Sequence, residues 1–429
     1  FMNKAEENTN TVYSTTLLTV GSTSTLFAIV CFILSPFIAT KLGYALHPEY
    51  IWILGIVVAM DAFGSIPFAY LRYLKKPIVF ASLKLLMIFT NIIFNIFFLV
   101  VCPWLFKHYP HLIAWFYNPS YGVGYIFVAN FISTLTVTLA LLPYVFVVSF
   151  NFNKALLKRM LRYSLPLLVL GIAGIMNQTV DKIIFPFLFE DKVEAQVQLG
   201  IYGACFKVAM IMMMFTQAFR FAYEPFVFSQ HKDKKSTAAY ADAMKYFIIF
   251  SLMIFLGMVF YLDILKYIIA ESYWEGLRVV PIILMSYVFQ GVFFNLSLWY
   301  KLTDKTQYGA YFSLLGTVIT LVINIVFVPL YGYMASAYAA FFCYLVMMLV
   351  SYYYGQKHMP INYDLKRIGL YVALSLSLYA LSIFVDSFVH IYTLELLYKT
   401  ILFLVFISIT INLDLKPMIP SVFAKFLKK

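Results

Sequence analysis

The stretch Phe206–Ser229, FKVAMIMMMFTQAFRFAYEPFVFS, is apolar enough to cross a bilayer, and yet it contains Lys207, Arg220 and Glu224. A charged side chain at the bilayer centre costs at least about 2.5–3.5 kcal/mol, so such residues face a partner or a water-filled cavity instead of lipid. The stretch therefore predicts a helical membrane protein with a polar cavity inside it.

Composition places the whole chain in the same class. Hydrophobic residues make up 63% of the 429 residues, charged residues only 12%, and the mean hydropathy is +0.87. Soluble domains carry about twice that charged fraction. The net charge of +12 comes from short Lys/Arg clusters between apolar segments, so we expect no nucleic-acid partner. The four cysteines lack CxxC spacing and are typical of buried apolar residues, and we expect no metal site.

About twelve apolar segments between Thr15 and Leu413 are long enough to span a membrane. Their apolarity is continuous, which predicts an all-α polytopic protein, because barrel strands would alternate at every second residue. Lys and Arg gather in alternate connections, about 20 on one side against 5 on the other. This bias predicts that both termini lie in the cytoplasm.

One connection, Asn151–Arg162 (NFNKALLKRMLR), has apolar residues on one helical face and basic residues on another. It predicts a short amphipathic helix on the cytoplasmic leaflet, with an ordinary basic loop as the alternative. We use it to divide the chain. The predicted parts are an incomplete N-terminal lobe of four helices (1–150), the amphipathic linker (151–162), a C-terminal lobe of six helices (163–356), and two extra helices with a basic tail (357–429).

The third span has a polar stripe, because Lys84, Asn91 and Asn95 are separated by 7 and 4 residues and lie within about 20° of one line on a helix. The stripe is a candidate wall for binding phosphate or sugar hydroxyls. In the alternative interpretation the two Asn join helices, while Lys84 reaches the cytoplasmic headgroups.

The fifth span contains two i, i+4 pairs on adjoining faces, Asn177 with Asp181 and Gln178 with Lys182. We expect Lys182 to contribute a positive charge to the cavity. The alternative is a charge pair between Asp181 and Lys182 at the outer end of the helix.

In the sixth span, Gln217, Arg220 and Glu224 share one face, whereas Lys207 lies about 140° away from Arg220. The alternative to a ligand site here is an Arg220–Glu224 ion pair within one helix. Among the candidate residues expected at mid-membrane depth, the cations Lys84, Lys182, Lys207 and Arg220 outnumber the acids Asp61, Asp181 and Glu224. This excess favours an anionic ligand, whereas a pump for cationic drugs should show the reverse.

Catalytic motifs are missing from the chain: it has no HExxH, GxSxG, Walker A or CxxC sequence. We therefore expect no enzyme. A membrane-embedded glycan polymerase or ligase is the alternative from the enzyme class, although such enzymes usually need one large outer loop, which this chain lacks.

Five stretches carry a resemblance to a known family: PFAYLRY (Pro67–Tyr73), YSLPLLVLGIAGIMNQTVDK (Tyr163–Lys182), QAFRFAYEPF (Gln217–Phe226), NLSLWYKLTDKTQYGA (Asn295–Ala310) and VPLYGYMASAYAA (Val328–Ala340). They resemble polysaccharide-biosynthesis flippases of the O-antigen type, in the multidrug/oligosaccharidyl-lipid/polysaccharide exporter superfamily. Gln178 departs from the pattern, because an acidic residue is expected there in many relatives.

The resemblance implies two six-helix lobes around a central cavity plus two C-terminal helices, fourteen in all, of which the first two would be absent here. It implies that undecaprenyl-pyrophosphate-linked oligosaccharide, such as a lipopolysaccharide O-antigen repeat unit, moves from the cytoplasmic to the periplasmic leaflet of the bacterial inner membrane by alternating access. An ion-coupled exporter of small molecules on the same fold is the alternative.

The resemblance also implies roles for individual residues. The expected substrate-cavity residues are Arg220, Lys207, Lys84, Lys182, Asn91, Asn95 and Gln217, and the expected charge partners or ion-coupling residues are Asp61, Asp181 and Glu224. No cofactor is expected beyond a coupling ion, Na⁺ or H⁺. The expected partners are the lipid-linked oligosaccharide, membrane lipids and the polysaccharide polymerase machinery.

Overall fold

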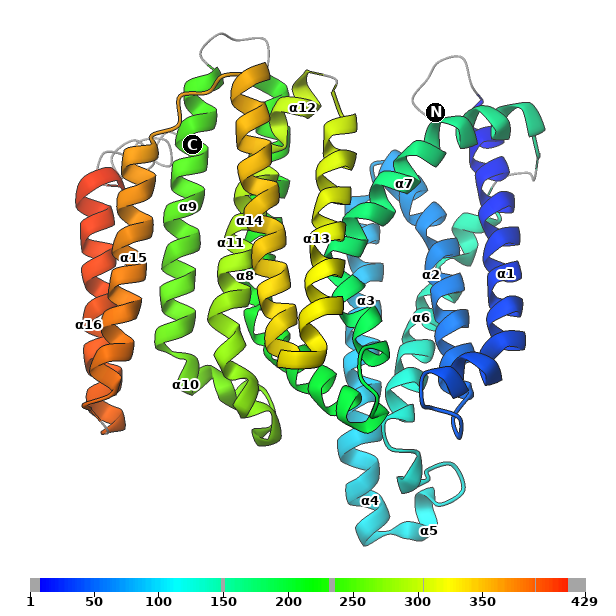
Figure 1. The fold of residues 1–429 in the computed structure, drawn as a ribbon. Coiled ribbons are helices and arrows are strands. Elements are labelled where there is room, and N and C mark those ends of the chain that lie inside the picture. The colour runs from blue at the N-terminus through cyan, green and yellow to red at the C-terminus, as the bar shows by residue number, and fades with distance from the viewer. Residues whose placement is uncertain (1–7, 148–150, 231–235, 304, 390, 416–429) are drawn as a thin grey trace. The chain divides into compact units, whose positions relative to one another are not determined.

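The computed structural model describes residues 8–147, 151–230, 236–303, 305–389 and 391–415. Within these ranges the chain forms helices and no strand (Figure 1). Eleven of the helices in these ranges are long and apolar enough to cross a membrane. The all-α polytopic fold class is thereby confirmed, with eleven candidate spans where the sequence predicts about twelve.

The chain divides into two compact units, residues 1–167 and 168–429. Helix α7 (Lys154–Ile184) runs across this boundary without a break. The predicted amphipathic linker therefore forms the first turns of α7 instead of a separate helix from residue 151. Its Leu156 is buried, while Lys154 and Lys158 are exposed, as an amphipathic segment requires.

Unit 1 is built on four long helices: α1 (Thr9–Lys41), α2 (Glu49–Tyr73), α3 (Pro77–Ile96) and α6 (Gly124–Val145). Helix α2 packs against both α1 and α6, and α6 also packs against α3. Gly55 allows the close approach of α2 to α1, since a Cβ added there would lie 2.5 Å from the Cβ of Cys31. The stacked rings of Tyr13 and Tyr70, 4.3 Å apart, join the same two helices.

Beyond α3 the chain continues through a π-helical turn, Phe97–Val101, into α4 (Cys102–His108). Such a turn changes the helical register, which suits Pro103, a residue without a backbone N–H. The short helix α5 (Pro110–Ile113) and a 3₁₀ turn (Pro119–Tyr121) lead to α6. Aromatic side chains fill this connection, and burial raises the pKa of the Tyr121 phenol to about 12.

Unit 2 contains α8 (Lys192–Gln230), α9 (Ser236–Phe260), α11 (Val280–Leu296), α13 (Gln307–Tyr331), α14 (Tyr333–His358), α15 (Leu365–Asp386) and α16 (Tyr392–Thr410). Helix α14 packs on α11 and α13, and α8 packs on α11. Helices α15 and α16 pack against α9 and each other, at the edge of the unit (Figure 1). Short elements join them: η3 (Phe185–Phe187), α10 (Leu262–Leu265), η4 (Lys266–Ile268), η5 (Glu271–Val279), α12 (Leu298–Leu302) and η6 (Ile411–Leu415).

Ion pairs connect α9, α15 and α16 to one another. At one end, Lys245 of α9 lies 3.0 Å from Asp414, which also accepts a hydrogen bond from Tyr371 of α15. At the other end, Lys399 of α16 lies 3.0 Å from Asp386, the last residue of α15. Lys399 is only 7% exposed, so its charge is paired as the apolar surroundings require.

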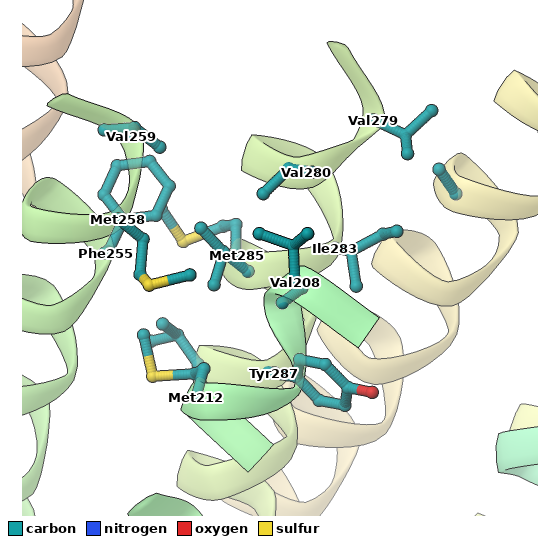
Figure 2. Close-up of a cluster of buried hydrophobic side chains, with 14 of the residues drawn as sticks. Val208, Met212, Phe255, Met258, Val259, Val279, Val280, Ile283, Met285 and Tyr287 are labelled. Carbon is teal, nitrogen blue, oxygen red and sulfur yellow. The ribbon is translucent and has the colours of Figure 1, made fainter. Parts of the chain in front are cut away.

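The core of unit 2 lies where α8, α9 and α11 meet. Figure 2 shows Met212 of α8, Phe255 and Met258 of α9, and Ile283 of α11 converging in this core. Close packing needs a small residue at one point, because Phe247 of α9 fills the space in front of Gly291 of α11. A Cβ added to Gly291 would lie 2.1 Å from Cζ of Phe247, a ring that is fully buried and cannot swing away freely.

We therefore predict that Gly291→Ala lowers the melting temperature of the purified protein. Overpacking a well-filled core costs roughly 1–3 kcal/mol, more than the gain of about 1 kcal/mol that alanine brings to a helix interior. The matched control is Gly203→Ala in α8, where an added Cβ meets nothing within 4 Å and stability should hold or rise. Equal melting temperatures for Gly291→Ala and the unmodified protein in thermal unfolding would contradict this packing.

Candidate functional site

Unit 1 contains a cavity of about 410 Å³ between α2, α3 and α6. Its charged lining consists of Asp61 and Arg72 from α2 and Lys84 from α3. Hydroxyl groups complete the polar lining, from Ser65, Thr134 and Thr138. The cavity therefore combines two cations, one carboxylate and three hydroxyls inside helices that are otherwise apolar.

Aromatic rings of the same cavity support its two cations. The Lys84 ammonium lies 4.3 Å from the ring centre of Phe68, and the Arg72 guanidinium lies 5.8 Å from that of Phe80. Among the described residues, neither cation has a carboxylate within 4.0 Å, Asp61 included. Both therefore keep hydrogen-bond donors available to a ligand.

Arg72 lines this cavity although it is not among the residues predicted from the sequence. The spacing contains a signal for it, since Asp61, Ser65, Phe68 and Arg72 are separated by 4, 3 and 4 residues and lie on one face of α2. All four line the cavity.

Asn91 and Asn95, predicted to share a polar wall with Lys84, lie outside the lining of this cavity. Asn91 Nδ2 donates to Asn130 Oδ1 at 3.4 Å and to Ser133 Oγ at 3.3 Å, both on α6. Asn95 Nδ2 donates to the carbonyl of Asn91 at 2.8 Å. In this conformation Asn91 joins α3 to α6, and Asn95 forms a hydrogen bond within α3. Asn91 thus has the helix-joining role of the alternative interpretation.

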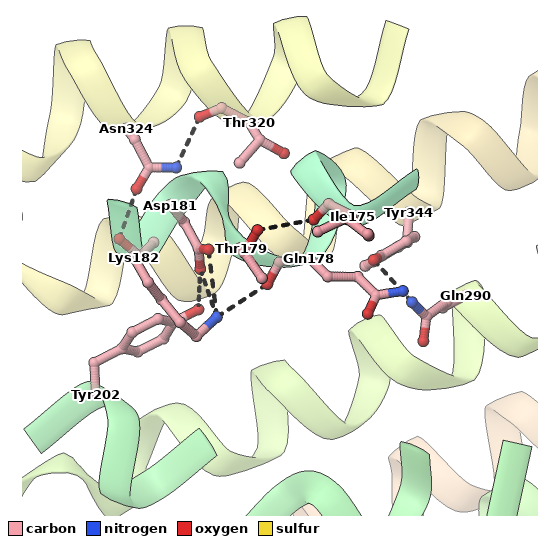
Figure 3. Close-up of polar contacts among 11 residues, drawn as sticks. Ile175, Gln178, Thr179, Asp181, Lys182, Tyr202, Gln290, Thr320, Asn324 and Tyr344 are labelled. Atoms are coloured by element: carbon pink, nitrogen blue, oxygen red, sulfur yellow. Dashed lines mark hydrogen bonds and ion pairs between the residues drawn. The ribbon is translucent and has the colours of Figure 1, made fainter. Parts of the chain in front are cut away.

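In unit 2, Asp181 and Lys182 of α7 form a closely bonded pair (Figure 3). Lys182 Nζ donates to both carboxylate oxygens of Asp181, at 3.2 and 3.3 Å, and to the carbonyl of Gln178 at 3.2 Å. The Tyr202 hydroxyl donates to the same carboxylate at 2.9 Å. The ring centre of Phe206 lies 3.7 Å from Nζ. The charge of Lys182 is therefore balanced by its own neighbour.

Other polar groups of α7, α11, α13 and α14 bond to one another near this pair. Asn177 accepts a hydrogen bond from Thr317 at 2.7 Å, and Gln290 donates to the Tyr344 hydroxyl at 2.8 Å. Asn324 donates to the Thr320 carbonyl at 2.7 Å (Figure 3). A cavity of about 200 Å³ opens beside Asp181, Lys182 and Tyr344.

Helix α8 distributes its predicted site residues over different surroundings. The Arg220 guanidinium lies 5.1 Å from the ring centre of Phe294 on α11 and lines a small pocket with Asn295. Gln217 is half-buried, and Lys207 is exposed on another side of the helix. The side chain of Glu224 lies outside the described part of the chain, so its predicted pairing with Arg220 stays a prediction.

Residues 188–326, which lie in unit 2, match the model of the MatE family. No curated protein matches the chain. Several solved structures resemble it, and three of them differ in their descriptions. The first is the lipid II flippase MurJ in an inward closed conformation, with 14% sequence identity and a TM-score of 0.72 over 95% of this chain and 86% of that one. The second is a multidrug resistance MATE family transporter of the MOP superfamily in an inward-facing conformation, with 15% identity and a TM-score of 0.60 over 81% of this chain and 80% of that one. The third is a MOP superfamily transporter from Pyrococcus furiosus, described as having a binding pocket of reversed polarity, with 12% identity and a TM-score of 0.55 over 81% of this chain and 79% of that one.

The chain shares its fold with the lipid II flippase MurJ and with a MATE family transporter of the MOP superfamily. It is a multi-pass membrane protein whose fold is shared by a flippase and by multidrug transporters, which confirms the resemblance at the level of the fold. The O-antigen specificity, the inner-membrane location and the orientation stay predictions. So do the absence of catalysis and the roles of the site residues, because sequence identities of 12–15% carry the fold alone.

The Asp181–Lys182 pair makes a prediction for stability. Lys182→Met should lower the melting temperature, because it leaves a buried carboxylate without its cation. The expected loss of unfolding free energy is up to about 3 kcal/mol. Asp181 is 5% exposed. Asp181→Asn/Lys182→Met, which removes both charges, should recover most of that loss. In a double-mutant cycle by thermal unfolding, strictly additive effects would contradict a coupled pair.

Proposed function

We propose that this protein is a flippase for undecaprenyl-pyrophosphate-linked oligosaccharide, which it moves from the cytoplasmic to the periplasmic leaflet by alternating access. The observation that carries the proposal is the unit 1 cavity, where Arg72 and Lys84 face a single carboxylate, Asp61. This lining has a net positive charge and lies within membrane-spanning helices. An anionic group on the substrate would offset that charge.

A pyrophosphate group suits the two cations in different ways. The planar guanidinium of Arg72 can bind two phosphate oxygens at once, whereas the ammonium of Lys84 acts as a compact point charge. The hydroxyls of Ser65, Thr134 and Thr138 add donors and acceptors beside them. Thr134 supports the proposal most, because its Oγ1 is buried and has no hydrogen-bond partner in the part of the chain that the structure describes, so a ligand could pair with it.

The other predicted site residues take secondary roles in this proposal. Arg220, Lys207 and Gln217 of α8 offer further donors to the substrate. Asp61, Asp181 and Glu224 position cations or bind a coupling ion, Na⁺ or H⁺. The protein would act in the bacterial inner membrane with both termini in the cytoplasm, beside the polymerase machinery that consumes the lipid-linked repeat unit.

An ion-coupled exporter of small molecules is the second candidate, because a multidrug transporter shares the fold. The charge of the unit 1 cavity supports the first candidate. A site for organic cations would need an excess of carboxylates, and here Asp61 is outnumbered by Arg72 and Lys84. A glycan polymerase or ligase is the candidate from the enzyme class, and extension of a labelled lipid-linked glycan by the purified protein would identify it.

The proposal predicts that Lys84→Gln and Arg72→Gln each leave lipid-linked repeat units on the cytoplasmic leaflet of the producing cells. Loss of one charge-assisted hydrogen bond, worth roughly 1.5–3 kcal/mol, should reduce export of surface polysaccharide at least about tenfold. Lys107→Gln, which removes an exposed lysine at the end of α4, is the matched control and should leave export unchanged.

Extraction and chromatography of the lipid-linked units, together with immunoblots of surface polysaccharide, measure both outcomes. Normal surface polysaccharide in the Lys84→Gln and Arg72→Gln cells, at equal protein levels, would overturn the assignment of this cavity. Arg220→Ala and Lys207→Ala test the α8 positions in the same cells. Arg220→Ala should have the larger effect, because Arg220 packs against Phe294 in a pocket whereas Lys207 is exposed.

A further inference from the structure

The cavity of about 200 Å³ in unit 2 differs in chemistry from the one in unit 1. Four helices line it: α7 with Gln178, Asp181 and Lys182, α8 with Phe206, α11 with Tyr287, and α14 with Tyr344. Its size suits one six-membered sugar ring better than a longer glycan. Figure 3 shows the polar side chains of α7 and Tyr344 converging in this region.

This cavity has charged residues but no net charge. Lys182 Nζ donates its hydrogen bonds to the two carboxylate oxygens of Asp181 and to the Gln178 carbonyl. The ring centre of Phe206 lies 3.7 Å from the same Nζ. Asp181 in turn accepts from Lys182 and Tyr202. A phosphate would find no uncommitted cation here, and an organic cation would find no uncommitted carboxylate.

Uncharged hydrogen-bonding groups are nevertheless left over. The hydroxyl of Tyr287 is buried and has no partner among the described residues, although the side chain lines the cavity and is only 3% exposed. Gln290 donates to the Tyr344 hydroxyl, while its own Oε1 is buried and unpaired. An unpaired buried polar group costs roughly 1–3 kcal/mol, so the Tyr287 hydroxyl, on a side chain that lines the cavity, favours a ligand that pairs with it.

We propose that the unit 2 cavity binds one neutral sugar residue of the substrate, through the hydroxyls of Tyr287 and Tyr344 and the exposed amide of Gln178. Sugar hydroxyls both donate and accept, as tyrosine hydroxyls and side-chain amides do, so the two sets can pair without any net charge. The inference rests on the proposed function, since it assigns the glycan of the same substrate to a site of its own.

Saturation-transfer NMR on the purified protein in detergent tests this inference. The probes are glucose, galactose, N-acetylglucosamine and rhamnose, and inorganic pyrophosphate is titrated separately as a probe of the unit 1 cavity. We expect at least one sugar to bind saturably. Tyr287→Phe should weaken that binding roughly threefold to tenfold, the equivalent of one hydrogen bond, and should leave pyrophosphate binding unchanged.

Tyr287→Phe should also raise the melting temperature of the unliganded protein, because it removes an unpaired buried hydroxyl and no hydrogen bond within the described structure. A purely structural tyrosine would change the melting temperature without changing sugar affinity. Tyr338→Phe, at a tyrosine of α14 that is 45% exposed, is the matched control and should change neither quantity.

The possible results separate this inference from the proposed function. Sugar binding that is equal in Tyr287→Phe and the unmodified protein overturns the sugar site, and so does the absence of saturable binding for all four sugars. A Tyr287→Phe effect on Na⁺ or pH response alone also overturns it, in favour of an ion site. Pyrophosphate binding that depends on Lys84 would still support the proposed function in each of these cases.

Discussion

The cost of placing a charged or polar group in a bilayer is the constraint on which this structure depends. Every such group in the spanning helices needs a partner or a cavity. Lys245 of α9 meets that requirement with Asp414, which follows α16, and Lys399 of α16 meets it with Asp386 of α15. Lys182 meets it with Asp181 and an aromatic ring. Lys84 and Arg72 meet it with a cavity and aromatic rings, without a carboxylate within 4.0 Å in the described structure, and the proposed function rests on that difference.

Much of the fold was predictable, because continuous apolarity and helical spacing are local properties of the sequence. The helical class and the approximate number of spans follow from them. The helical line of Lys84, Asn91 and Asn95 was also predictable, but its meaning was not. Whether an amide faces a cavity or a neighbouring helix depends on which helix packs there, and α6 supplies Asn130 and Ser133 to Asn91.

Charge pairing was the least predictable part of the site. Adjacent residues of a helix point about 100° apart, so spacing alone favours i, i+4 partners over the pair of Asp181 and Lys182. The long lysine side chain nevertheless reaches its neighbour, helped by the Gln178 carbonyl and Phe206. Counting Lys182 as an available cation therefore overestimates the positive charge of unit 2. Omitting Arg72 underestimates that of unit 1. The two units consequently present different chemistry, one cavity positive and the other neutral.

Transport by the purified protein tests the central claim, an anionic lipid-linked substrate, most directly. Proteoliposomes would carry a fluorescent short-chain polyprenyl-pyrophosphate sugar, and dithionite added outside would report how much of it reaches the outer leaflet. We expect the protein to exchange this lipid between leaflets and not to move the organic cation ethidium. Protein-dependent ethidium transport, with no movement of the pyrophosphate-linked lipid, would contradict the central claim.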